Sequence, residues 1–196
     1  MSEKRTELSE LGEFGLIDRL AEGLKPKHAS TVMGIGDDAA VIDHGDEYGL
    51  ISTDMLVEGI HFDLSYAPLQ HLGYKAIAVN VSDIAAMNGI PQQVVVSLAL
   101  SNRFSVEAVE ALYSGIKAAA DDFNVDVVGG DTTASQSGLV ISVSVFGKTP
   151  KDLVTYRKGA NSSQQQGAQT TRSRSAVAES SSATTSPPDL RLLCIS

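Results

Sequence analysis

Met33-Gly34-Ile35-Gly36-Asp37-Asp38-Ala39-Ala40 is the most informative stretch of this chain, and Ile51-Ser52-Thr53-Asp54-Met55 follows it closely. Asp83 then lies inside an apolar segment, and Gly129-Gly130-Asp131-Thr132-Thr133 ends another apolar run. Carboxylates at strand ends and on an apolar helix are costly unless a cation neutralises them. A hard divalent cation with oxygen ligands is the simplest neutraliser. The pattern therefore predicts a Mg²⁺-dependent phosphate site.

The composition is that of an ordinary globular domain. The chain has 196 residues, 42% of them hydrophobic, and one cysteine, Cys194, which excludes an intramolecular disulfide and a cysteine-based zinc site. The charged start has no signal-peptide core and no run is long enough to span a membrane, so we expect a cytoplasmic protein. A net charge of −9 argues against nucleic-acid binding. Phosphates would then reach the site as metal complexes.

The chain changes character near Ala160. Residues 161–196 include nine serines and, before Leu190, almost nothing that could enter a core. We expect a disordered low-complexity tail at 161–196 and a folded ATP- and Mg²⁺-binding domain at 1–160. An alternative is that the tail is foreign to the fold.

Within the first 160 residues, hydrophobic periodicity predicts alternating helices and strands. The expected helices cover 7–24, 72–87 and 105–123, and the expected strands cover 39–42, 48–53, 94–100, 125–128 and 139–146. This order indicates an α+β domain with a mixed β-sheet and helices on one face.

Each acidic residue also has a purely structural interpretation. Asp38 could belong to a turn, the Ser52-Thr53-Asp54 triplet could cap a helix, and Asp131 could be a turn aspartate. Asp83 shares a helix face with Asn80 and could form a salt bridge with Lys75. The combination of all four favours a metal site.

Three further residues are ambiguous by themselves. His61 is a lone histidine among apolar neighbours, Tyr113 lies on a helix that would bury it, and Arg157 lies near the domain edge. Their default roles are a structural histidine, a core residue and a solvated charge. The chain has no P-loop, no kinase-type catalytic loop and no Gly-x-Ser-x-Gly elbow.

Several long motifs, in order, resemble the thiamine-monophosphate kinase family within the aminoimidazole ribonucleotide synthetase-like superfamily. They are Gly-Glu-Phe-Gly-Leu-Ile, Gly-Ile-Gly-Asp-Asp-Ala-Ala, Ser-Thr-Asp-Met-Leu-Val-Glu-Gly-x-His-Phe, Gly-Tyr-Lys-Ala-x-Ala-Val-Asn-x-Ser-Asp-Ile-Ala-Ala-Met and Gly-Gly-Asp-Thr-Thr. The resemblance covers about residues 8–160 and implies the N-terminal domain of that fold.

The resemblance implies transfer of the ATP γ-phosphate to thiamine monophosphate, giving thiamine diphosphate, and a homodimer formed through the N-terminal domains. The residues it assigns to Mg²⁺ are Asp38, Ser52, Thr53, Asp54, Asp83 and Asp131. Tyr113, Gly130, Asp131 and Arg157 would contact ATP, and His61 would contact the substrate.

The sequence departs from the family pattern after residue 160. Family members continue into a second α/β domain, which we expect to be missing here, although residues 189–196 faintly resemble its first strand. We therefore expect weak Mg²⁺-ATP binding with little or no turnover. Two alternatives stay open: an inactive nucleotide-binding or dimerisation remnant, and another ATP-dependent synthetase of the superfamily.

Overall fold

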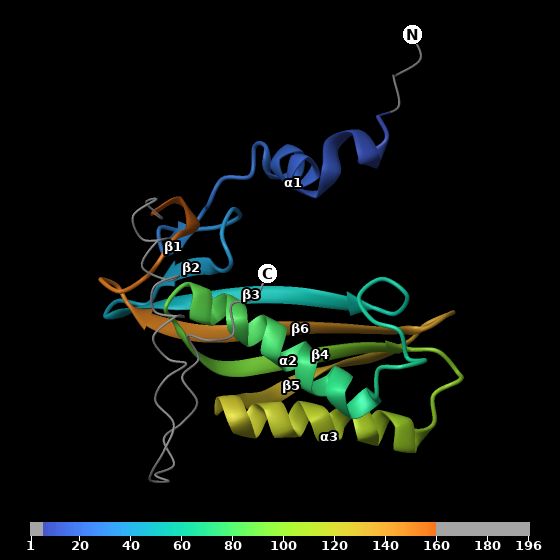
Figure 1. The fold of residues 1–196 in the computed structure, drawn as a ribbon. Coiled ribbons are helices and arrows are strands. Elements are labelled where there is room, and N and C mark those ends of the chain that lie inside the picture. The colour runs from blue at the N-terminus through green and yellow to red at the C-terminus, as the bar shows by residue number, and fades with distance from the viewer. Residues whose placement is uncertain (1–5, 160–196) are drawn as a thin grey trace, which may run out of the picture.

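The computed structural model describes residues 6–159, so the tail predicted at 161–196 lies outside the described residues. A six-stranded sheet carries two packed helices on one face, with a further helix beyond its edge (Figure 1). The helices are α1 (Leu8–Ala21), α2 (Leu69–Ala86) and α3 (Val106–Phe123), and a short 3₁₀ turn, η1, covers Arg157–Gly159. The strands are β1 (Thr31–Met33), β2 (Ala40–Asp43), β3 (Glu47–Val57), β4 (Ile90–Leu100), β5 (Asp126–Ala134) and β6 (Leu139–Pro150).

The sheet has the order β1-β2-β3-β6-β4-β5. All neighbours are antiparallel except β4 and β5, which are parallel and joined through α3. A parallel pair needs such a crossover because its strands run in the same direction. The predicted mixed sheet with helices on one face is confirmed, and β6, the last strand, lies between β3 and β4.

Alternation along the strands separates two faces of the sheet. Leu50 and Leu56 of β3 are buried on the face that α2 covers, with the alternating valines of β4 and β6. The opposite face, here called the open face, carries Ile51, Met55 and Phe146, which remain 38%, 56% and 37% exposed. The core therefore lies entirely between the sheet and the α2–α3 pair.

The α2–α3 contact depends on two glycines. A Cβ atom on Gly73 would overlap the backbone of Leu112, and one on Gly115 would overlap the backbone of Gln70. The two helix backbones therefore touch where each lacks a side chain, and this contact fixes α2 against β3 and β6.

Several expected elements differ from the observed ones. β1 was not predicted, because three residues give no periodicity. β5 was expected to end at 128 but continues to Ala134, because pairing with β4 holds the glycines in a strand.

The helix expected at 7–24 forms α1, but Gly12, at φ +65°, interrupts it and none of its residues is buried. Figure 1 shows α1 on the side of the sheet where β1 and β2 lie, apart from α2 and α3. The start at Ser105 is confirmed, since its Oγ accepts a hydrogen bond from the Ala108 N–H.

Candidate functional site

A cavity of about 750 Å³ brings together six of the residues singled out in the sequence. It lies between α1, the β1–β2 loop, β3, α2 and the start of η1. Its lining includes Asp38, Ser52, Thr53, Asp54, Asp83 and Arg157. The β1–β2 loop can enter the cavity because Gly36 adopts φ +126°, a backbone conformation that side-chain-bearing residues rarely take.

Hydrogen bonds between β3 and α2 hold the Asp83 carboxylate and the backbone of Asp54 in place. The Ser52 hydroxyl donates to Asp83 Oδ2 at 2.8 Å. The Asp54 N–H donates to Asn80 Oδ1 at 3.1 Å, and Asn80 Nδ2 donates to the Ala76 carbonyl at 2.9 Å. The salt bridge suggested between Asp83 and Lys75 is wrong, because Lys75 Nζ donates to the His61 carbonyl.

Asn80 is the residue whose importance sequence reasoning missed. It is only 1% exposed, and its amide fixes the backbone position of Asp54. A signal was present, since a polar side chain lies on the same face as Asp83 in an otherwise apolar helix and must find a partner there.

Negative charges gather in this cavity without full compensation. Burial raises the pKa of Asp83 to about 6; the charges of Asp54 and Asp38 add to the effect, while Ser52 and Arg157 oppose it. Burial also raises the pKa of Asp54, partly offset by the nearby His61 charge. A divalent cation bound between Asp54 and Asp83 would stabilise the ionised form that burial disfavours at both carboxylates.

Arg157 supplies the positive charge that reaches this cluster. Its Nη2 forms an ion pair with Asp38 Oδ1, and its backbone N–H donates to Asp37 Oδ2 at 3.1 Å. Arg157 is therefore an exposed charge, as its default interpretation has it, but one that is also paired with the acidic loop. Asp37, which sequence reasoning left without a role, anchors η1 to the acidic loop.

The oxygen atoms that line the cavity are of the kind that bind magnesium, but they do not converge on one point. We call these oxygen atoms the donor set, and it is not closed. Carboxylate and hydroxyl oxygens are the ligands that hard divalent cations prefer. Yet within residues 6–159 no group of three or more His, Cys, Asp or Glu side chains is arranged to hold a metal ion. Asp38, Asp54 and Asp83 share the cavity without converging.

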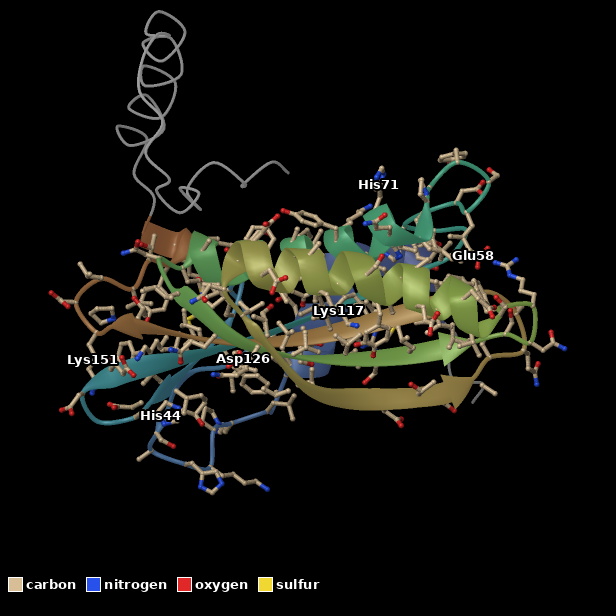
Figure 2. The ribbon with its side chains drawn as sticks, turned by 90° about the horizontal axis from the view of Figure 1, so that it is seen from below. His44, Glu58, His71, Lys117, Asp126 and Lys151 are labelled. Atoms are coloured by element: carbon tan, nitrogen blue, oxygen red, sulfur yellow. The ribbon has the colours of Figure 1, made fainter. Side chains whose placement is uncertain are left out.

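His61 lies in the loop between β3 and α2, next to this cavity but not in its lining. Its Nδ1 accepts a hydrogen bond from the Val57 N–H at 3.0 Å, which fixes the orientation of the ring. The loop is also joined to the far end of the sheet through Glu58, which pairs with Arg103 and accepts from the Leu139 N–H. Figure 2 shows Glu58 at the opposite end of the sheet from Lys151.

Asp131 and Gly130 lie well away from the acidic cavity. Pairing aligns Asp54, Val143, Val96 and Gly130 across β3, β6, β4 and β5. Three strand spacings of about 4.8 Å place Gly130 about 14 Å from Asp54. The expectation that Asp131 follows the end of a strand is wrong, since it lies within β5.

Asp131 also faces the other way. It is paired with Ser97, whose exposed side chain lies between buried Val96 and Leu98, so both residues belong to the open face. Asp54 alternates with Ser52, whose hydroxyl reaches α2, so it lies on the helix-covered face. One copy of this chain therefore does not bring Asp131 to the other carboxylates.

Tyr113 lies on α3 and is partly buried against the core. It lines a separate hollow of about 550 Å³ with Val106, Val109, Glu110 and Lys117, all from the same helix. Figure 2 labels Lys117 on α3 and Asp126 at the start of β5. This hollow is distinct from the acidic cavity.

No helix among residues 6–159 has the length and apolar character needed to cross a membrane.

Comparison with known proteins identifies relatives of the described domain. The thiamine-monophosphate kinase of Bacillus subtilis is 42% identical over 152 residues, covering 75% of this chain and 45% of that protein. The Aquifex aeolicus thiamine-monophosphate kinase is 42% identical over 144 residues, covering 74% and 44%. This chain therefore spans less than half the length of these relatives.

Solved structures give the same grouping. The structure of AaThiL complexed with AMPPCP and TMP matches with a TM-score of 0.71 at 39% identity, covering 80% of this chain and 48% of that chain. PurL from T. maritima, complexed with AMPPCP, matches with a TM-score of 0.57 at 18% identity and supports the fold alone. The family described as AIR synthase related protein, N-terminal domain, matches residues 36–149. The chain thus belongs to the AIR synthase related proteins, of which it contains the N-terminal domain.

Proposed function

We propose that this chain carries the nucleotide- and Mg²⁺-binding half of a thiamine-monophosphate kinase, which transfers the ATP γ-phosphate to thiamine monophosphate in the cytoplasm. The observation that supports this most directly is the shared cavity of Asp38, Asp54 and Asp83, faced by Arg157. AaThiL complexed with AMPPCP and TMP aligns with 80% of this chain, so the same activity is the natural proposal here.

In this proposal the chain's residues bind and position the phosphates. Asp38, Asp54 and Asp83, with the Ser52 and Thr53 hydroxyls, would hold Mg²⁺, which neutralises charge on phosphate oxygens when bound. The hydrogen bond from Asp54 to Asn80 keeps one ligand fixed. Arg157 would meet the nucleotide phosphates, and His61, beside the cavity, would contact thiamine monophosphate.

Asp131 and Gly130 enter the proposal through a homodimer. The open face exposes apolar Ile51, Met55 and Phe146, a surface suited to a second copy. Asp131 lies on that same face, about 14 Å from Asp54 of its own chain by strand spacing. The acidic cavity reaches the open face through Ile51 and Thr53, so if two open faces pack together, Asp131 of one copy would approach the cavity of the other. Tyr113, on α3 at the other face of the sheet, lies away from such an interface, and its contact with ATP stays a prediction.

The test uses the Mg²⁺ dependence of nucleotide binding. Calorimetry with AMPPCP should give binding that requires Mg²⁺ and disappears with EDTA. Asp54→Asn should weaken this binding at least about tenfold, since a charged ligand to the metal is lost. Asp46→Asn, in the exposed turn before β3, should leave it unchanged. The proposal would be refuted if the wild type did not bind AMPPCP, or if the Asp54→Asn variant bound it with the same affinity as the wild type.

A second measurement addresses the acceptor. Incubation with Mg²⁺-ATP and thiamine monophosphate should be followed by chromatography for thiamine diphosphate, against a reaction without thiamine monophosphate. We expect this chain to form thiamine diphosphate, but slowly. The same assay with His61→Ala should show a raised KM for thiamine monophosphate while AMPPCP affinity stays the same.

A further inference from the structure

Arg157 occupies an unusual position for a residue proposed to meet nucleotide phosphates. Its guanidinium is bound to Asp38, and its backbone N–H is bound to Asp37, about 120 residues earlier in the chain. The Asp38 side chain is 17% exposed, whereas that of Arg157 is 58% exposed. The carboxylate is thus held in place while the guanidinium projects over it from solvent.

This ion pair engages one carboxylate of a donor set that is not closed around one point. Asp38, Asp54 and Asp83 line one cavity, yet no three donors converge within residues 6–159. A carboxylate oxygen engaged by a guanidinium is unavailable to a metal ion, and both cations compete for the same charge. Arg157 therefore supplies the positive charge that a divalent cation would otherwise supply.

We infer that Arg157 is an exchangeable counter-ion of the acidic cluster, which holds Asp38 in the metal-free protein and releases it when a divalent cation binds. The released guanidinium is then free to bind the nucleotide phosphates, a second step that rests on the proposed function. The backbone contact with Asp37 would keep η1 in place during this exchange, so only the side chain needs to turn.

The exchange couples the two ligands. A cation that frees Arg157 improves phosphate binding, and phosphates that hold Arg157 away from Asp38 improve cation binding by the same factor. Without Arg157 this part of the coupling disappears, although direct contacts between metal and phosphate persist.

The first test measures Mn²⁺ affinity in the absence of nucleotide, using the electron paramagnetic resonance signal of free Mn²⁺. Arg157→Gln should bind Mn²⁺ about three- to tenfold more tightly than wild type, a range set by the modest worth of a solvent-exposed ion pair. Lys158→Gln is the matched control, since Lys158 lines the same cavity but carries no ion pair to Asp38. Equal affinities in wild type and Arg157→Gln, or an equal gain in Lys158→Gln, would overturn the inference.

The second test follows the guanidinium itself. In ¹⁵N spectra of the full chain, the Arg157 Nε–Hε resonance, assigned by its loss in Arg157→Gln, should move when Mg²⁺ is added without nucleotide. A resonance that stays fixed while Mg²⁺ binds would contradict release. Arg157→Lys keeps the charge but loses the planar fork, so its Mn²⁺ affinity should lie between those of wild type and Arg157→Gln. This conservative variant serves as the test if the glutamine variant fails to fold.

The third test separates this inference from the proposed function. Saturating AMPPCP should raise Mn²⁺ affinity more in wild type than in Arg157→Gln. If the chain bound no AMPPCP, the proposed function would fail, while tighter Mn²⁺ binding by Arg157→Gln would still support exchange at Asp38. If neither protein bound Mn²⁺, the exchange itself would be refuted.

Discussion

At the scale of single residues, the acidic cavity costs stability in the metal-free protein. Asp83 is held among like charges, with one hydroxyl donor and a distant guanidinium to compensate it. Such a group destabilises the folded state whenever it is ionised, because its charge is better solvated in the unfolded chain. The proposed metal-binding role of Asp83 is therefore opposed to stability at this position.

The stability of the metal-free protein should depend on pH through Asp83. Its pKa rises from 3.8 to about 6, so the folded state binds this proton more tightly than the unfolded state. The contribution of Asp83 thus improves as the pH falls from about 6 to about 4 and is least favourable above pH 6. Asp83→Asn should raise the free energy of unfolding at pH 7.5 by about 1 kcal/mol, discounted for partial exposure.

Thermal unfolding in EDTA at pH 7.5 and pH 4.5 would measure this effect. The gain from Asp83→Asn should be present in full at the higher pH and reduced to about a third at the lower one, because pH 4.5 still lies above the pKa of 3.8 in the unfolded chain. Asp46→Asn, at an exposed turn, controls for the loss of a charge. A variant less stable than wild type at pH 7.5 would contradict the description of Asp83 as an uncompensated charge.

At the scale of elements, the local sequence pattern predicted the helices and strands that pack into the core. It failed where the pairing between strands determines how far a strand extends. The cores of α2, β4, α3 and β6 were found because buried positions recur with a regular period. The strand predicted at 125–128 ended too early because Gly129 and Gly130 resemble a turn, whereas pairing with β4 keeps them extended within β5. α1 was expected to pack because its apolar residues are spaced as in a helix, yet Phe14 is 72% exposed.

The α2–α3 contact gives a test at this scale. Gly73→Ala or Gly115→Ala should destabilise the domain by about 3 kcal/mol, because the new methyl group meets the facing helix backbone, which cannot move aside cheaply. Urea denaturation would measure the loss. Gly129→Ala is the matched control, since its Cβ would find only Val95 at 3.9 Å. Full stability in both helix variants would mean that the helices are not in backbone contact.

At the scale of the whole molecule, the sequence indicated the site residues but not their distribution. Asp38, Asp54, Asp83 and Arg157 come together in one copy, whereas Asp131 lies on the open face. Motif order along the chain carries no information about which face of a sheet a residue occupies until the strand register is known. The role of Asn80 was not predicted for a related reason, since its hydrogen-bond partner is a backbone N–H on another element.

The proposed homodimer can be tested through the open face. Met55→Glu should convert a dimer into a monomer in sedimentation velocity, because the interface would have to bury an unpaired charge. The same variant should weaken Mg²⁺-dependent AMPPCP binding if Asp131 acts across the interface. Leu153→Glu, at an exposed apolar position away from the sheet faces, is the control. A wild-type monomer would contradict this assembly.

The place of β6 in the sheet has a consequence for synthesis on the ribosome. β3 and the β4–β5 pair have no common partner until β6, Leu139–Pro150, enters between them. A nascent chain that has reached residue 138 therefore holds two unjoined halves of a sheet with open edges, a state prone to misassociation. Once Pro150 has emerged, every strand of the domain can pair. A ribosome that pauses just before β6 would prolong the vulnerable interval, whereas a pause just after it would allow folding to finish.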